Sequence, residues 1–144
     1  MSQGQQSKVR SWLALLLDFT LEATEQADLL EGWILNVDGA SNSKGAGIGI
    51  VLTTPEGYII EQSFALGFQV SNNETEYEAV LAGLRMAITL GVTWLEVWCD
   101  SSLVVNQVSG EYVVRDARMA EYLQLVLGLK SKNPSMRLQM GSQI

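Results

Sequence analysis

The sequence predicts an α/β fold: a mixed five-stranded sheet in which a three-strand antiparallel meander lies beside two parallel strands, with flanking helices. Apolar runs of strand length are separated by turns rich in Gly, Ser, Asn and Pro. A long helical pattern follows the third run. Helical and strand patterns then alternate, and a strand that follows a helix is expected to run parallel to the strand it joins. The predicted strands are residues 33–38, 46–54, 58–66, 94–100 and 135–140.

The chain divides into an N-terminal leader or tether, residues 1–31, and a folded domain over residues 32–144. Residues 11–31 mix apolar patches with acids and show no single helical face, so we expect a tether with partial helix. The apolar run at residues 12–17 is too short to span a membrane and lacks a signal-peptide cleavage site. We therefore expect an intracellular protein, cytoplasmic or nuclear, that is neither secreted nor embedded in a membrane.

The second predicted strand contains alternating glycines. Gly45, Gly47 and Gly49 leave one face of this strand nearly bare. Because a bare face lets another segment come close, we expect a backbone or a helix to approach the sheet there.

Capping residues mark the starts of the predicted helices. Asn72 or Asn73 is a suitable N-cap for the first helix, and Ser101 or Ser102 for a short second helix. Asp116 is expected to open the last helix, which carries apolar residues at helical spacing. The domain is thus expected to follow the order βββαβααβ.

Three carboxylates are expected to meet at one edge of the sheet. Asp38 and Asp100 each follow an apolar strand run. If these two strands are parallel neighbours, both aspartates leave the sheet at the same edge, where open α/β sheets usually bind ligands. The first helix begins near that edge and can place Glu76 beside them. Such a cluster suits a hard cation such as Mg²⁺.

Glu76 is the one glutamate of the first helix that we expect to face inward. On a 3.6-residue period it shares a face with Val80 and Ala87, whereas Glu74 and Glu78 point the opposite way. A carboxylate on the packed side of a helix is costly unless a cation or a proton meets it. Its position therefore supports the expected metal site.

The residue types present exclude several kinds of chemistry. The 144 residues include one cysteine and no histidine, which excludes an internal disulfide framework, Ser–His and Cys–His pairs, and Cys-rich or His-ligated metal sites. The net charge of −7 is unusual for a nucleic-acid-binding protein. It is unevenly spread: residues 1–32 carry −3, residues 33–114 carry −7 and residues 115–144 carry +3. On charge alone, an ordinary acidic protein is the simpler interpretation.

Four segments between about Trp33 and Met140 carry a family resemblance. They read VDGASNSKGAGIGIVL, SNNETEYEAVLAGLRMA, VWCDSSLVVNQVSGEY and RDARMAEYL. In this order and spacing the chain resembles the ribonuclease H family, and most closely the ribonuclease H domain of plant Ty3/gypsy-type retrotransposon polyproteins. Residues 11–31 are also similar to the segment that links the reverse transcriptase portion to this domain in such polyproteins.

The resemblance implies endonucleolytic cleavage of the RNA strand of RNA–DNA hybrids. It implies that Asp38, Glu76 and Asp100 are the catalytic residues and hold two Mg²⁺ ions, for which Mn²⁺ can substitute. The partners that it implies are an RNA–DNA hybrid and, in a longer polyprotein, a reverse transcriptase domain.

Short polar side chains beside the acids are the candidates for contacting the hybrid, since RNA displays its 2′-hydroxyls in the minor groove. These candidate nucleic-acid-binding residues are Asn42, Ser43, Lys44, Asn72, Asn73 and Ser101. The alternative interpretation is ordinary turn and cap chemistry. Arg115 and Arg118 are either phosphate contacts or solvated charges at a helix end.

The sequence departs from the family pattern after the fifth predicted strand. The family carries a fourth carboxylate there, at the start of a last helix, whereas no Asp or Glu follows Glu121 in this chain. We therefore expect a domain truncated at its C-terminus, without the C-terminal helix and with a weakened second metal site. Three interpretations stay open: an impaired ribonuclease H, a module that binds hybrids without cleaving them, and an inactive retroelement-derived fragment.

Overall fold

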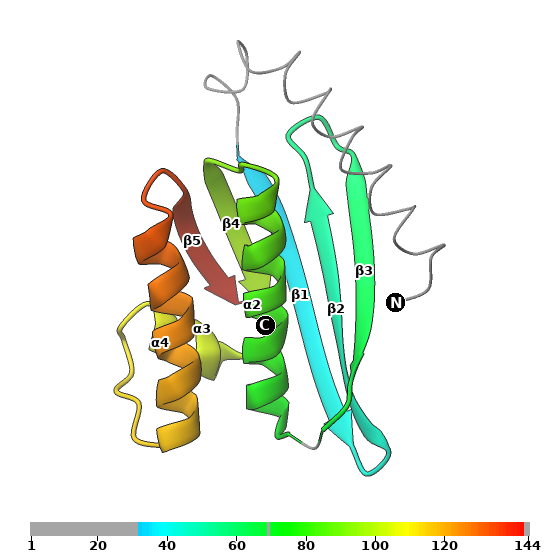
Figure 1. Cartoon of the computed structure of the whole chain (residues 1–144), viewed down its shortest axis with the longest axis vertical. Helices are drawn as coiled ribbons and strands as arrows, with labels where there is room; N and C mark the ends of the chain where they lie inside the picture. The colour runs from blue at the N-terminus through cyan, green and yellow to red at the C-terminus, as the bar shows by residue number, and fades with distance from the viewer. Residues whose placement is uncertain (1–31, 69, 143–144) are drawn as a thin grey trace.

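The predicted strands form one sheet, in the order β3-β2-β1-β4-β5, in the computed structural model, which describes residues 32–68 and 70–142 (Figure 1). β1 pairs antiparallel with β2 and parallel with β4. β2 pairs antiparallel with β3, and β4 pairs parallel with β5. The predicted mixed sheet is therefore confirmed. The strands are β1 (Trp33–Asn42), β2 (Gly45–Thr53), β3 (Ile59–Leu66), β4 (Trp94–Cys99) and β5 (Arg137–Ser142).

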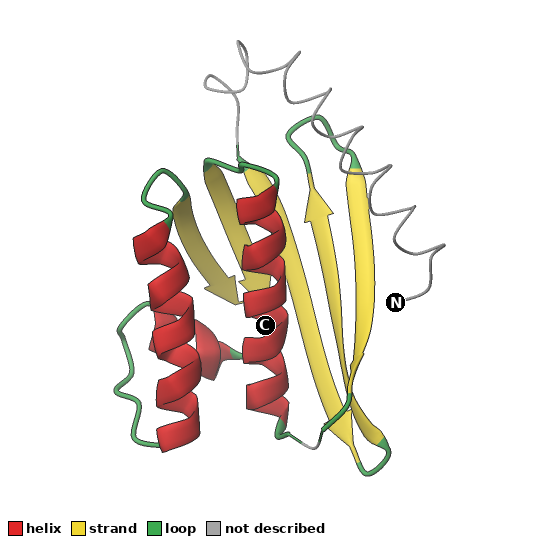
Figure 2. Ribbon diagram, in the orientation of Figure 1, coloured by secondary structure: helices red, strands yellow, loops and turns green. Residues whose placement is uncertain are grey.

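The described part of the chain contains three helices; in Figure 2 the two long ones lie side by side in front of the sheet, and the short one is seen behind them. They are α2 (Asn72–Thr89), α3 (Ser102–Val108) and α4 (Ala117–Lys132). None of them is long and apolar enough to cross a membrane. The predicted leader, residues 1–31, lies outside the described residues.

The core lies between these helices and one face of the sheet. Leu35 and Val37 in the first half of β1 and alternate residues of β4 are fully buried, as the two-residue period of a strand requires when one face is covered. Leu35 and Leu95 from the strands meet Tyr77, Leu81 and other residues of α2 in one buried cluster. On the opposite face, Ile34 and Trp94 remain partly exposed.

The first hairpin is longer than the sequence predicted. We expected the strand to end at Asp38, but β1 continues to Asn42, which pairs with Gly45. Only Ser43 and Lys44 are left for the turn. Gly45 has a positive φ of 145°, a conformation that glycine adopts without strain and that lets the chain reverse so tightly.

The close approach expected at the glycines of β2 is wrong for the described residues. A Cβ atom added at Gly45 or Gly49 would meet no heavy atom within 4 Å, and one at Gly47 would make only an ordinary contact of 3.5 Å with the carbonyl oxygen of Phe64 in β3. The close approach instead joins α2 to β1. A Cβ at Gly39 would lie 2.7 Å from the Thr75 carbonyl group, and one at Gly83 would lie 2.5 Å from Leu35 Cδ2.

The caps of α3 and α4 are as predicted, whereas the cap of α2 is not. Ser101 and Asp116 are the N-caps of α3 and α4. The cap of α2 is Ser71, whose hydroxyl accepts a hydrogen bond from the Glu74 amide at 3.2 Å. A serine followed three residues later by a glutamate is a capping pattern, so this start was readable in the sequence.

Candidate metal centre

The three predicted acids are brought together at one edge of the sheet. Asp38 lies in β1, Asp100 directly follows β4, and Glu76 lies near the start of α2. Because Val37 pairs with Cys99 in the parallel register, the two aspartates follow equivalent positions on neighbouring strands. One carboxylate oxygen from each acid lies within 4.8 Å of those of the other two.

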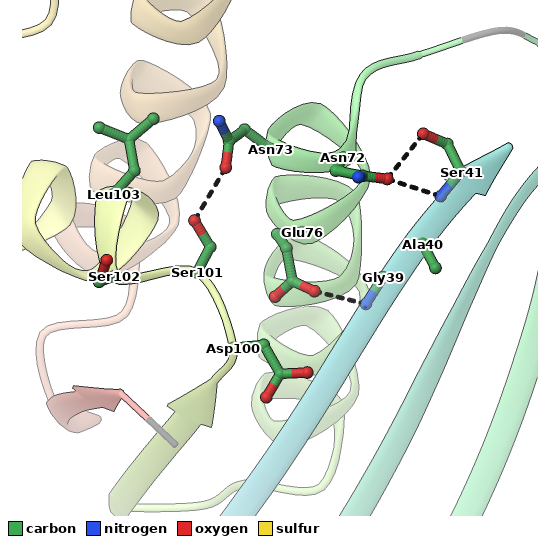
Figure 3. Close-up of a pocket in the computed structure, with 10 residues that line it drawn as sticks. All are labelled: Gly39, Ala40, Ser41, Asn72, Asn73, Glu76, Asp100, Ser101, Ser102 and Leu103. Carbon is green, nitrogen blue, oxygen red and sulfur yellow. Dashed lines mark hydrogen bonds between the residues drawn. The ribbon is translucent and has the colours of Figure 1, made fainter. Parts of the chain in front are cut away.

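A backbone hydrogen bond orients Glu76. The Gly39 amide donates to Glu76 Oε1 at 2.6 Å, as Figure 3 shows. The missing side chain at Gly39 makes this contact possible, since a Cβ atom there would collide with the backbone of α2. Gly39 is thus a site residue that we did not predict. It is an alternate residue of β1 together with Leu35 and Val37, and this pattern could have indicated that it faces the helices.

The second oxygen of Glu76 makes no hydrogen bond of good geometry. Oε2 is buried and meets no donor at hydrogen-bonding distance and angle among the described residues, and Glu76 as a whole is only 4% exposed. A buried carboxylate oxygen without a donor is costly. Carboxylate oxygens are also the ligands that Mg²⁺ and similar cations prefer. The residues present therefore fit a divalent cation held by Asp38, Glu76 and Asp100.

The electrostatics of the cluster favour a cation or a proton. Burial raises the pKa of Glu76 above its usual value; the backbone amides of Gly39 and, more weakly, Asp100 oppose this shift, and the charges of Asp38 and Asp100 add to it. Loss of hydration raises the pKa of Asp100 as well, together with a hydrogen bond and the negative charge of Asp38. A divalent cation would relieve this repulsion and displace the protons.

An open pocket of about 420 Å³ lies beside the acids (Figure 3). Its polar groups come from the end of β1, the first turn of α2 and the start of α3. The lining residues are Gly39, Ala40, Ser41, Asn72, Asn73, Glu76, Asp100, Ser101, Ser102 and Leu103. The pocket therefore places hydrogen-bonding groups next to two of the three carboxylates.

Three of the six candidate nucleic-acid-binding residues line this pocket: Asn72, Asn73 and Ser101. The side-chain oxygen of Asn72 accepts from both the amide and the hydroxyl of Ser41 at 2.8 Å. Asn73 Oδ1 accepts from Ser101 Oγ at 3.0 Å. Each side-chain oxygen thus has a structural role, while the amide nitrogens make no hydrogen bond within the described residues.

The other three candidates lie at the tip of the first hairpin. Asn42, Ser43 and Lys44 are exposed and do not line the pocket. Asn42 Oδ1 accepts from the Lys44 amide at 2.8 Å, which is ordinary turn chemistry. Ser41, which the sequence reasoning missed, occupies the pocket position next to them.

The prediction that only Glu76 faces inward is wrong, because Glu74 is only 8% exposed. Helix α4 packs beside α2, so a second side of α2 is covered in addition to the side on the sheet. Glu74 Oε1 accepts from the Ser71 hydroxyl, and Arg118 Nε of α4 lies 3.6 Å from Oε2. Arg118 is thus paired with Glu74 while its side chain stays 66% exposed, and Arg115 is exposed just before α4.

The family model described as reverse transcriptase-like matches residues 36–140. The chain belongs to this family. Its domain is ribonuclease H-like, as solved structures also show, so the predicted resemblance is confirmed at that level.

Two curated relatives match part of the domain. A bifunctional protein of Mycobacterium tuberculosis is 38% identical over 86 residues, covering 57% of this chain and 23% of that protein. Ribonuclease HI of Halobacterium salinarum is 35% identical over 81 residues, covering 55% of this chain and 41% of the relative. The matched region therefore spans less than half the length of either relative.

Solved structures of ribonucleases H share the fold. The N-terminal ribonuclease H domain of the same mycobacterial protein is 30% identical with a TM-score of 0.67, covering 77% of this chain and 82% of that one. Ribonuclease H1 of H. salinarum is 26% identical with a TM-score of 0.67, covering 77% and 86%. LC11-RNase H1, solved in complex with an RNA/DNA hybrid, is 28% identical with a TM-score of 0.67, again covering 77% and 86%.

Proposed function

We propose that this domain hydrolyses the RNA strand of RNA–DNA hybrids endonucleolytically, with Asp38, Glu76 and Asp100 holding divalent cations. The observation that carries the proposal is the cluster of three carboxylates within 4.8 Å of one another, which includes a buried oxygen without a donor. When bound, Mg²⁺ or Mn²⁺ supplies Lewis-acid stabilisation of the phosphoryl transfer. The ribonuclease H-like fold and the hybrid-bound relative support hybrids as the substrate class.

The chain itself supplies the orientation of the three ligands. The Gly39 amide holds one oxygen of Glu76, and the other oxygen accepts no hydrogen bond from the described residues. Asp38 lies in β1 and Asp100 directly follows the parallel strand β4, so the register of the sheet sets the spacing of their backbones. Ligands held in place before a cation binds need little rearrangement, which favours binding and catalysis.

The pocket residues are proposed to contact the hybrid in its minor groove. The amide nitrogens of Asn72 and Asn73 can donate to 2′-hydroxyls or base edges, since their oxygens are already bonded within the protein. Ser101 would act mainly by fixing Asn73. Asn42, Ser43 and Lys44 at the hairpin tip would contact the backbone of the hybrid, with Lys44 offering a cation to a phosphate.

The number of acids bears on the rate of cleavage. Three carboxylates gather at the site within the described residues, one fewer than in the four-acid pattern of the family. We propose slower cleavage for that reason. The same feature favours the second candidate function, a module that binds hybrids without cleaving them, and the inactive retroelement-derived fragment is its limiting case.

We also propose that the domain comes from a retroelement polyprotein, of the plant Ty3/gypsy type, in which it adjoins a reverse transcriptase domain. The supporting observations are the four motif segments and the reverse transcriptase-like family itself. In this arrangement residues 1–31 act as the tether, and residues 32–144 form the catalytic domain.

The test is cleavage of a short labelled hybrid in Mg²⁺ and in Mn²⁺, with single-stranded RNA and duplex DNA as control substrates. Asp38→Asn and Glu76→Gln should each lower the rate at least about 100-fold. Glu61→Gln on the exposed edge of β3 is the matched control and should leave the rate unchanged. Unchanged turnover in the acid variants would overturn the metal site.

A binding experiment separates the two candidate functions. Labelled hybrid is titrated with the wild-type chain in Ca²⁺, which supports binding but poorly supports this chemistry. Binding in Ca²⁺ without cleavage in Mg²⁺ or Mn²⁺ would favour the binding module. The absence of both binding and cleavage would favour the inactive fragment.

A further inference from the structure

A buried hydrogen bond lies immediately behind the metal-binding face of α2. Tyr77 follows Glu76 in the chain and is fully buried. Its hydroxyl donates to Gln107 Oε1 of α3 at 2.6 Å, and Gln107 is itself only 7% exposed.

Helix α3 is fastened to α2 near both of its ends. At its start, Ser101 Oγ donates to Asn73 Oδ1 at 3.0 Å. Ser101 Oγ also caps α3 by accepting a hydrogen bond from the Val104 amide. Near its end, Gln107 accepts from Tyr77. Asp100 is the residue directly before Ser101. The placement of α3 against α2 therefore also sets where Asp100 lies relative to Glu76.

The other side of the Tyr77 ring faces a second tyrosine. The rings of Tyr77 and Tyr122 stack with their centroids 5.5 Å apart and their planes 9° from parallel. The Tyr122 hydroxyl donates to Glu78 Oε1 at 2.8 Å, which ties α4 to α2. The Tyr122 hydroxyl thus joins α4 to α2, whereas the Tyr77 hydroxyl joins α2 to α3, the helix that begins directly after Asp100 and Ser101.

We infer that Tyr77 is a positioning residue for the metal centre, because its hydrogen bond to Gln107 fixes the separation of Glu76 and Asp100. Glu76 and Tyr77 are consecutive in one rigid helix, so a rotation of α2 that moves one side chain moves the other. Without the bond, α3 is held less firmly against α2, and the link from Asp100 to Ser101 at the start of α3 gains freedom to move relative to Glu76. This inference rests on the proposed metal centre and deepens it.

The test is a Mn²⁺ titration of the full chain, followed by the electron paramagnetic resonance signal of free Mn²⁺ without nucleic acid. Tyr77→Phe keeps the ring and removes the hydroxyl, and it should raise the dissociation constant about tenfold, the lower end of effects seen for residues behind metal ligands. Tyr122→Phe is the matched control and should change the dissociation constant less than twofold.

A purely structural role for Tyr77 predicts something different. Tyr77→Phe leaves the Gln107 amide buried without its partner, which lowers stability. Adding Gln107→Met removes that buried polar group and should restore the metal-free melting temperature, while the Mn²⁺ affinity stays about tenfold low. Affinity that recovers together with the melting temperature, or wild-type affinity in Tyr77→Phe, would overturn the inference.

The failure of the inference can be told apart from the failure of the metal centre. Glu76→Gln should weaken Mn²⁺ binding in the same titration. If the wild type binds Mn²⁺ no better than Glu76→Gln, the metal centre is wrong and the inference falls with it. If Glu76→Gln weakens binding and Tyr77→Phe does not, the metal centre stands and only the positioning role is overturned.

Discussion

Two buried glutamates, two residues apart on α2, meet different surroundings. Glu74 and Glu76 are 8% and 4% exposed, and each has one oxygen without a hydrogen-bond donor. Glu74 has a cation from the chain itself, since Arg118 Nε lies 3.6 Å from Oε2. Glu76 instead faces two further carboxylates. The comparison shows that burial alone does not indicate a metal site. The informative feature is a buried carboxylate that is surrounded by other carboxylates instead of being paired with an arginine or lysine.

The contact that distinguishes Glu76 from Glu74 is its hydrogen bond to the backbone of β1. Gly39→Ala places a Cβ atom 2.7 Å from the Thr75 carbonyl group, so α2 must move away from β1. We expect the free energy of unfolding to fall by about 1–3 kcal/mol, as for other overpacked sites, and hybrid cleavage to fall with it. Urea unfolding and the cleavage assay measure the two effects.

Gly49→Ala is the matched control for this substitution. Gly49 also lies in the sheet, but a Cβ atom there would meet nothing within 4 Å. Its effect on unfolding should stay within about 0.5 kcal/mol. Equal losses in the two variants would show that the approach of α2 to Gly39 is unimportant.

The unmatched charge of Glu76 should appear in the pH dependence of stability. Its pKa in the folded chain is raised above the ordinary 4.5, chiefly by burial. Its stabilising contribution is therefore complete below about pH 4.5 and is lost as the pH rises through the raised value. In metal-free protein, Glu76→Gln should gain stability relative to the wild type between pH 4 and pH 7.

Urea unfolding of the two proteins in chelator, across this pH range, measures the difference. Saturating Mg²⁺ or Mn²⁺ should stabilise the wild type at pH 7, because it binds the folded state, and should do so less in Glu76→Gln. A difference between the proteins that is constant with pH would contradict the raised pKa.

The smallest expected effect concerns the ion pair between Arg118 and Glu74. Arg118→Gln removes the cation, but the arginine side chain is 66% exposed and its nitrogen lies 3.6 Å from the carboxylate. The loss in unfolding free energy should therefore be about 1 kcal/mol or less. Arg115→Gln is the control. A loss of Mn²⁺ affinity in Arg118→Gln larger than in Arg115→Gln would mean that the two glutamates are not independent.

Much of the fold was predictable because it follows from local patterns. The two-residue alternation of burial in β1 and β4 depends only on one covered face, and the parallel direction of β4 follows from the helix that precedes it. The same logic predicted that Asp38 and Asp100 would lie at one edge. The cap at Ser71 was also readable, since Glu74 follows it at the right spacing.

The missed features depend on contacts between distant segments. A single-helix period cannot show that α4 covers a second side of α2, so Glu74 was expected in solvent. Gly39 and Ser41 looked like turn residues, because only their pairing with β2 shows that β1 continues past Asp38. The hydrogen bond between Tyr77 and Gln107 joins residues 30 positions apart and has no local signature.

The most direct test of the central claim is Mn²⁺ binding by the two glutamate variants in parallel. Glu76→Gln and Glu74→Gln make the same chemical change, two residues apart, at similarly buried positions. We predict that Glu76→Gln weakens Mn²⁺ binding at least about tenfold and that Glu74→Gln changes it less than twofold. Equal weakening in both variants, or none in Glu76→Gln, would contradict a metal centre formed by Asp38, Glu76 and Asp100.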